Sequence, residues 1–178
     1  MDTTDVEVRV AQPDEWAVVR DVRLAALAEA PDAFASTLSR ETGQAEASWR
    51  SRIAARPWFL AWLAGRPAGL VAMFPEQAPL TGPNSAPPDW HLVSMWVRPQ
   101  ARGEGVAGRL VRAVLAHASA AGAAQVTLWV AIGNDRARAF YQRMGFVPTG
   151  RRQMYPRAGT TDLDEEEFAC PLDGVRQP

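Results

Sequence analysis

The fold is decided by residues 92–108, which read Leu-Val-Ser-Met-Trp-Val-Arg-Pro-Gln-Ala-Arg-Gly-Glu-Gly-Val-Ala-Gly. The apolar run from Leu92 to Val97 predicts a buried strand, and Pro99, which has no N–H group, ends its ladder. A glycine-rich turn follows, and the apolar residues after Gly108 recur at helical spacing. The segment therefore predicts a strand, a tight turn and a helix. Such a turn presents N–H groups at the positive end of a helix dipole, where phosphate binds.

Three glycines of this turn also match the Gly-x-Gly-x-x-Gly pattern of dinucleotide-binding sites, namely Gly103, Gly105 and Gly108. That pattern places its first glycine directly after the strand and an acidic residue about 20 residues further on. Here five residues separate Val97 from Gly103, and no acidic residue lies between Gly108 and Asp135. A nucleotide-binding oxidoreductase is therefore the less favoured alternative.

The composition indicates one globular domain over residues 1–178, because 47% hydrophobic and 22% charged residues suffice for a core. The net charge of −1 gives no basic field that would attract nucleic acid or an anionic membrane. The N-terminus is acidic and polar, unlike a signal peptide, and no apolar run is long enough to span a bilayer. The single cysteine, Cys170, cannot form an internal disulfide, which is typical of a reducing cytoplasm. We therefore expect a cytoplasmic protein.

The rest of the chain alternates between strand and helix patterns, separated by turn and capping residues. We expect strands at residues 6–10, 59–63, 68–74, 92–97, 125–130, 146–148 and 167–170, and helices at 13–30, 44–55, 109–121 and 136–144. A turn at residues 65–67 is expected to join the second and third strands into a hairpin. Residues 75–89, with five of the 14 prolines, predict a long loop that either covers a site or is a surface excursion.

Two motifs carry a family resemblance. The first is Arg102-Gly103-Glu104-Gly105-Val106-Ala107, and the second is Asn134-x-x-Ala137-x-x-x-Tyr141-x-x-x-Gly145-Phe146. They resemble the Gln/Arg-x-x-Gly-x-Gly/Ala signature and the Asn-x-x-Ala…Tyr…Gly-Phe block of the GNAT superfamily of N-acetyltransferases. The resemblance implies an α/β (α+β) fold, with helices flanking a mixed, mostly antiparallel central sheet in the order β-α-α-β-β-β-α-β-α-β-β. The C-terminal part of the chain fits this pattern only loosely.

The resemblance also implies a cosubstrate, acetyl-CoA, with no metal. In the family the glycine turn holds the pyrophosphate of coenzyme A, and backbone groups of the preceding strand contact the pantetheine and the oxyanion. The matching positions are Met95, Trp96, Val97, Arg102, Gly103, Gly105, Val106, Ala107, Gly108, Asn134 and Ala137. Three arginines, Arg136, Arg138 and Arg143, either approach the 3′-phosphate or adenine or are solvated helix charges.

The candidate catalytic residues are Tyr141 and His91. Tyr141 matches the family's tyrosine that protonates the departing thiolate, and a phenol with a pKa of about 10 is protonated at neutral pH. The alternative is that Tyr141 only packs beside Phe140 on an amphipathic helix. His91 stands about where some family members place the general base, on a strand face expected to include Met95 and Val97, and an imidazole suits proton removal at neutral pH. The alternative is a partly exposed histidine at a strand start.

The partner implied by the resemblance is a primary amine on an unidentified small molecule or peptide, and a homodimer is compatible with it. An acidic run before the last strand either attracts a cationic amine or forms a solvated edge; its members are Asp162, Asp164, Glu165, Glu166 and Glu167. The alternative function is a non-catalytic acyl-CoA-binding sensor or regulatory module.

Overall fold

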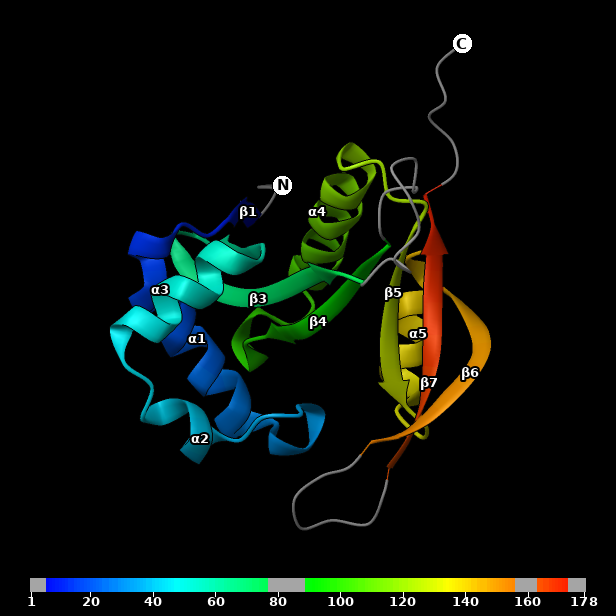
Figure 1. Cartoon of the computed structure of the whole chain (residues 1–178), viewed down its shortest axis with the longest axis horizontal. Coiled ribbons are helices and arrows are strands. Elements are labelled where there is room, and N and C mark those ends of the chain that lie inside the picture. Colours follow the sequence, from blue (N-terminus) through cyan, green and yellow to red (C-terminus); the bar gives the residue numbers. More distant parts are fainter. Residues whose placement is uncertain (1–5, 77–88, 156–162, 173–178) are drawn as a thin grey trace, which may run out of the picture. The chain divides into compact units, whose positions relative to one another are not determined.

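The computed structural model of the chain describes residues 6–76, 89–155 and 163–172, whose course Figure 1 traces. The strands of this part are β1 Val6–Val10, β2 Trp58–Leu63, β3 Arg66–Pro75, β4 Trp90–Val97, β5 Gln125–Ala131, β6 Val147–Tyr155 and β7 Leu163–Pro171. The helices are α1 Trp16–Glu29, α2 Leu38–Thr42, α3 Glu46–Ala55, α4 Val106–Ala120 and α5 Asp135–Arg143, with short 3-10 turns η1 Pro13–Glu15, η2 Pro31–Ala33 and η3 Pro99–Ala101. Among the described residues no helix is long and apolar enough to cross a membrane.

The strands form one sheet in the order β1-β2-β3-β4-β5-β7-β6. Antiparallel pairing joins β1 to β2, β2 to β3, β5 to β7 and β7 to β6, whereas β4 and β5 run parallel. The expected α/β class, with a mixed and mostly antiparallel sheet flanked by helices, is confirmed.

The chain groups into two compact units, each built from two segments. Unit 1 comprises Met1–Phe74 and Val93–Val114, and unit 2 comprises Pro75–Leu92 and Leu115–Pro178. The boundary after Leu92 lies inside β4, and the boundary after Val114 lies inside α4. The expectation of a single domain stays a prediction.

The core of unit 1 is built by α1, α3 and the strands β2 and β3. Helix α1 presents Val19, Val22, Ala26 and Leu27 at helical spacing, and all four are at most 1% exposed. They pack with the tryptophans of α3, β2 and β4, of which Trp49 is completely buried. Each large side chain buried in this way contributes about 1.5–3 kcal/mol to folding. This packing fixes the unit in which the glycine turn stands.

The hairpin of β2 and β3 forms as expected, but its turn lies at residues 64–65 and not at the predicted residues 65–67. The turn consists of Ala64 and Gly65, with φ values of 48° and 72°, and Arg66 already pairs with Leu63 in the strands. Two left-handed residues match the twist of a hairpin, which explains why the turn is so short. Pro67 is tolerated inside β3 because the register shifts opposite it.

Three further predictions differ from the structure. The short helix α2 was not expected; its N-cap is Thr37, whose side chain accepts a hydrogen bond from the backbone N–H of Arg40. Strands β6 and β7 are much longer than predicted, because they pair with each other over most of their described length. The acidic run does not precede the last strand, since Asp164 to Glu167 lie within β7. Residues 77–88 of the expected loop and Asp162 lie outside the described residues.

Candidate active site

The predicted site residues divide between the two units. Unit 1 holds the end of β4, with Met95, Trp96 and Val97, and the glycine turn of residues 102–108. Unit 2 holds His91 and the residues of the second motif, which are Asn134, Ala137 and Tyr141.

The glycine turn of unit 1 has the backbone shape that a phosphate site needs. Gly103 and Gly105 have φ values of 94° and 78°, a left-handed conformation that favours glycine. A Cβ atom added to either residue would meet nothing within 4 Å, so the surface over the turn is open. Beyond the turn, Arg109 is the first residue whose backbone N–H donates to a backbone carbonyl, that of Gly105, at 3.2 Å. Among the described residues the N–H groups of the first turn of α4 therefore lack a backbone acceptor, which makes them available to an anion.

The side chain of Arg102 is engaged within the protein. Its Nε donates to Val97 O at 3.1 Å, and its Nη2 donates to Glu29 Oε2 at 2.8 Å. The same Glu29 oxygen accepts a hydrogen bond from Trp96 Nε1 at 2.9 Å. The hydrogen bonds from Arg102 and Trp96 lower the pKa of Glu29 below its ordinary value. Arg102 thus ties the glycine turn to the end of α1, and its contact with a cosubstrate stays a prediction.

Glu29 is a residue that sequence reasoning missed. It is the last residue of α1 and lies 67 positions before Trp96. No local pattern marks a glutamate at a helix end as the anchor of a distant turn. Only the packing of α1 beside β4 in unit 1 reveals the contact.

Strand β4 contains an unusual residue at its centre. Ser94 has a φ value of 59°, which is left-handed and uncommon for a residue other than glycine. Trp96 and Val97, which follow it in the strand, are both buried. The expectation that His91 shares one strand face with Met95 and Val97 stays a prediction. A backbone conformation of this kind costs about 1–3 kcal/mol and is found mainly at functional sites.

His91 is the centre of a buried polar cluster in unit 2, not a partly exposed residue. Its side chain is 9% exposed, and its Nδ1 lies 2.7 Å from Thr127 Oγ1. Thr127 Oγ1 donates to Glu76 Oε1 at 2.7 Å, and the same carboxylate oxygen lies 3.4 Å from His91 Nδ1. The hydroxyl has one proton, which it gives to Glu76, so it accepts from Nδ1–H of His91. In the neutral ring the lone pair is then on Nε2.

Burial sets the charge state of His91. Desolvation lowers the pKa of the imidazole below its ordinary value, while Glu76 and Glu167 act in the opposite direction and do not cancel the effect. His91 is therefore neutral at neutral pH, as a general base must be. Glu76 and Thr127 were missed by sequence reasoning, because their link to His91 depends on the register between β4 and β5.

Tyr141 lies on α5 with its ring almost completely buried. The residue is 8% exposed and packs edge-on against Phe140 and Phe146, with ring centroids 5.1 and 5.6 Å away. Burial raises the pKa of the phenol, so the hydroxyl stays protonated. The hydroxyl makes no hydrogen bond to any residue that the structure describes. A protonated phenol with no hydrogen-bond partner in the described part of the chain is suited to donate to a ligand.

The other residues of the second motif form the start of α5. Asn134 is the N-cap, and its Oδ1 accepts a hydrogen bond from the backbone N–H of Ala137 at 3.2 Å. This capping bond explains why Asn134 and Ala137 are three positions apart in the motif. The side chain is exposed, so contact with a cosubstrate stays a prediction.

Two acidic residues of β7, Glu166 and Glu167, are buried and paired rather than solvated. Glu166 and Glu167 are 8% and 3% exposed. Arg138 donates to Glu166 at 2.5 Å and lies over the ring of Phe168, so it is not a free helix charge. Glu167 accepts from Arg151 and Thr149, both at 2.8 Å. The pair of Glu166 and Arg138 also fixes α5, and with it Tyr141, against β7.

Known proteins share both the sequence pattern and the fold. Residues 23–146 match the sequence model of the acetyltransferase (GNAT) family. A GNAT-family acetyltransferase from Streptococcus pneumoniae has a similar structure, with a TM-score of 0.74 and 18% identity over 94% of this chain and 99% of that one. A Salmonella typhimurium protein assigned to the acetyltransferases, solved with its cofactor acetyl-CoA, gives a TM-score of 0.72 and 15% identity over 98% of each chain.

A ribosomal-protein-alanine N-acetyltransferase from Brucella melitensis is also similar, with a TM-score of 0.69 and 19% identity over 93% of this chain and 99% of that one. At these identities the structural likeness shows the fold alone. Comparison of the sequence with those of curated proteins gives no match.

Proposed function

The chain belongs to the GNAT family of acetyltransferases, and from this premise we propose that it transfers the acetyl group of acetyl-CoA to a primary amine. The observation that carries the proposal is the glycine turn. Two left-handed glycines open the surface there, and among the described residues the N–H groups at the start of α4 lack a backbone acceptor, so they are available to an anion. These features suit the pyrophosphate of coenzyme A.

The proposed reaction needs one proton taken from the amine and one given to the thiolate. Acetyl-CoA supplies a thioester, whose carbonyl carbon is attacked by the neutral amine. A C–N bond forms in a tetrahedral oxyanion, and the C–S bond then breaks. Backbone groups around Met95 and Trp96 are the proposed partners of the oxyanion and the pantetheine.

His91 is the proposed base, and Tyr141 is the proposed acid. In this proposal the neutral imidazole, whose Nδ1 is hydrogen-bonded to Thr127, takes the amine proton. Tyr141 gives its phenolic proton to the sulfur of the departing thiolate and recovers one from solvent. The products are an amide and free coenzyme A, because the proton that His91 releases to solvent balances the one that Tyr141 recovers. The acceptor itself is proposed only as a class, a primary amine of a small molecule or a peptide.

Binding of the cosubstrate is tested by thermal unfolding with acetyl-CoA, coenzyme A or NADPH. A ligand at about 100 times its Kd stabilises the folded state by about 2.7 kcal/mol. We expect acetyl-CoA and coenzyme A to stabilise the wild type and to have little effect on Gly105→Glu. The matched control is Gly150→Glu, which changes another left-handed, open glycine, with a φ value of 82°. It should respond as the wild type does.

Two results would contradict the proposal. Stabilisation by NADPH alone would mean that the turn holds a dinucleotide. Stabilisation by acetyl-CoA without amine-dependent release of coenzyme A, across a library of primary amines, would favour a non-catalytic acyl-CoA-binding module.

A further inference from the structure

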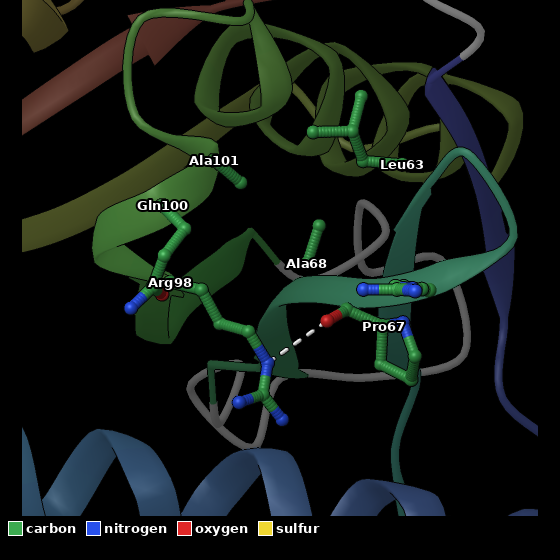
Figure 2. A pocket seen from close by; sticks show the side chains of 7 residues that line it. Leu63, Pro67, Ala68, Arg98, Gln100 and Ala101 are labelled. Carbon is green, nitrogen blue, oxygen red and sulfur yellow. Dashed lines mark hydrogen bonds between the residues drawn. The ribbon is translucent and has the colours of Figure 1, made fainter.

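A pocket in unit 1 is separate from the residues assigned above. Its volume is about 470 Å³. The apolar part of its lining comes from Leu63, Pro67, Ala68 and Ala101. The polar part comes from Arg66, Arg98 and Gln100. Two segments thus build the pocket, the end of the β2–β3 hairpin and residues 98–101 with the turn η3, as Figure 2 shows.

The guanidinium of Arg98 is held in a fixed position at this pocket. Its Nε donates to Pro67 O at 2.8 Å, and its backbone N–H donates to Ala68 O at 2.8 Å. The guanidinium also lies 5.9 Å from the centre of the Trp96 ring. In Figure 2 the two terminal nitrogens point away from Pro67. Within the described residues these nitrogens make no hydrogen bond or ion pair, so their N–H groups are available to a ligand.

The charge of the side chains that line the pocket indicates which kind of ligand it favours. It contains two arginines and one amide, and none of its seven residues is acidic. The other arginine, Arg66, is exposed and likewise has no ion pair within the described residues. This local excess of positive charge contrasts with the net charge of −1 for the whole chain. A cation would be repelled, and a neutral molecule would leave the guanidinium donors unpaired.

We propose that this pocket binds a small anionic molecule that carries a phosphate or carboxylate group beside an apolar portion. The fork of Arg98 matches the two oxygens of such a group, and Arg66 adds a second positive charge. The four apolar residues of the lining contact the carbon skeleton.

The pocket differs from the glycine turn, although the two are close in sequence. Arg102, the first residue of that turn, directs its side chain to Val97 O and Glu29 rather than to the pocket. The pocket ends at Ala101, whose backbone N–H donates to Arg98 O at 2.9 Å. A ligand on Arg98 therefore touches the segment that leads into the turn and leaves the glycines unoccupied.

The experiment is a calorimetric titration of the full-length protein with phenyl phosphate, which combines the anionic group with an apolar ring. Phenol is the neutral control ligand, and saturating coenzyme A is added in a second series. The variants are Arg98→Gln and Arg66→Gln. The second does not disturb the hydrogen bond to Pro67 and covers the case in which the first fails to fold. Arg40→Gln removes an exposed arginine of α2 that does not line the pocket, and serves as the matched control.

We expect saturable binding of phenyl phosphate and none of phenol. Affinity should fall roughly tenfold or more in each of the two pocket variants, as for a lost charge-assisted hydrogen bond, and stay unchanged in Arg40→Gln. Coenzyme A should not displace the ligand. Absence of saturable binding, equal affinity in all variants, or full displacement by coenzyme A would each overturn the proposal.

Discussion

Tyr141 combines a packed ring with a hydroxyl that has no partner among the described residues. Replacement by phenylalanine should therefore leave stability nearly unchanged, because the ring contacts remain. As the proposed acid, the hydroxyl should matter for turnover, so we expect kcat to fall by about 100-fold in Tyr141→Phe. Steady-state kinetics with a responsive amine, together with thermal unfolding, measure the two effects.

A second variant separates packing from catalysis. Phe146 contacts the Tyr141 ring from the adjoining segment and is 1% exposed. Phe146→Leu should lower the free energy of unfolding by about 1 kcal/mol and reduce kcat much less than Tyr141→Phe does. If Tyr141→Phe turned over as fast as the wild type, Tyr141 would be a packing residue only.

His91 predicts how stability and activity depend on pH. Its folded pKa lies below the ordinary value of 6.5, because burial disfavours the charged ring. Above about pH 6.5 the histidine is neutral in both the folded and unfolded states and contributes no pH dependence. Below that pH the unfolded chain binds a proton that the folded protein resists. The free energy of unfolding should therefore decrease as the pH falls below about 6.5, until the folded pKa is passed.

Urea unfolding at several pH values in the wild type and in His91→Gln measures this dependence. In His91→Gln, the part of the pH dependence of the free energy of unfolding that is due to His91 should be absent. Activity of the wild type should increase with pH through the folded pKa of His91 and then level off. If the free energy of unfolding changed with pH equally in the wild type and in His91→Gln, groups other than His91 would cause the loss of stability at low pH.

Strands β3 and β4 approach each other so closely at one point that only glycine fits between them. A Cβ atom on Gly69 would lie 2.6 Å from Trp96 O, a backbone atom that cannot turn aside. We expect Gly69→Ala to lower the free energy of unfolding by about 1–3 kcal/mol. Chemical denaturation measures the change. Gly43→Ala is the control, because its Cβ would meet nothing within 4 Å, and its stability should equal or slightly exceed that of the wild type.

The elements that sequence predicts well are those with long, regular patterns. The stripe of α1 and the apolar run of β4 are of this kind, and both are found where expected. The short helix α2 has too few residues to show a period, so it was missed. The left-handed Ser94 was missed for another reason. Serine gives no sign of the conformation that its neighbours impose, whereas Gly103 and Gly105 do.

At the scale of the candidate site, sequence identifies the residues of each motif but not their partners. His91 and Tyr141 could be named because they match positions in a family pattern. Glu76, Thr127 and Glu29 could not, because each reaches its partner through sheet register or packing across tens of residues. Their contacts now explain the charge state of His91 and the anchoring of the glycine turn.

The whole molecule is built from two units whose segments alternate along the chain. Unit 1 cannot complete its core from residues 1–74, because Trp96 belongs to that core and Gly69 packs on the backbone of β4. We expect a fragment of residues 1–74 to show no cooperative thermal transition and no dispersed amide resonances. A cooperative transition in this fragment would show that the N-terminal segment folds without β4.

The buried thiol of Cys170 can report on local opening of the folded protein. This thiol, the single one in the sequence, is 8% exposed on β7, and burial raises its pKa. An alkylating reagent can therefore react with it rapidly only when β7 separates from its surroundings. The rate of labelling would record how often that happens under native conditions, without any introduced probe. Comparing the labelling rate with and without acetyl-CoA would show whether cosubstrate binding makes opening of the C-terminal strands less frequent.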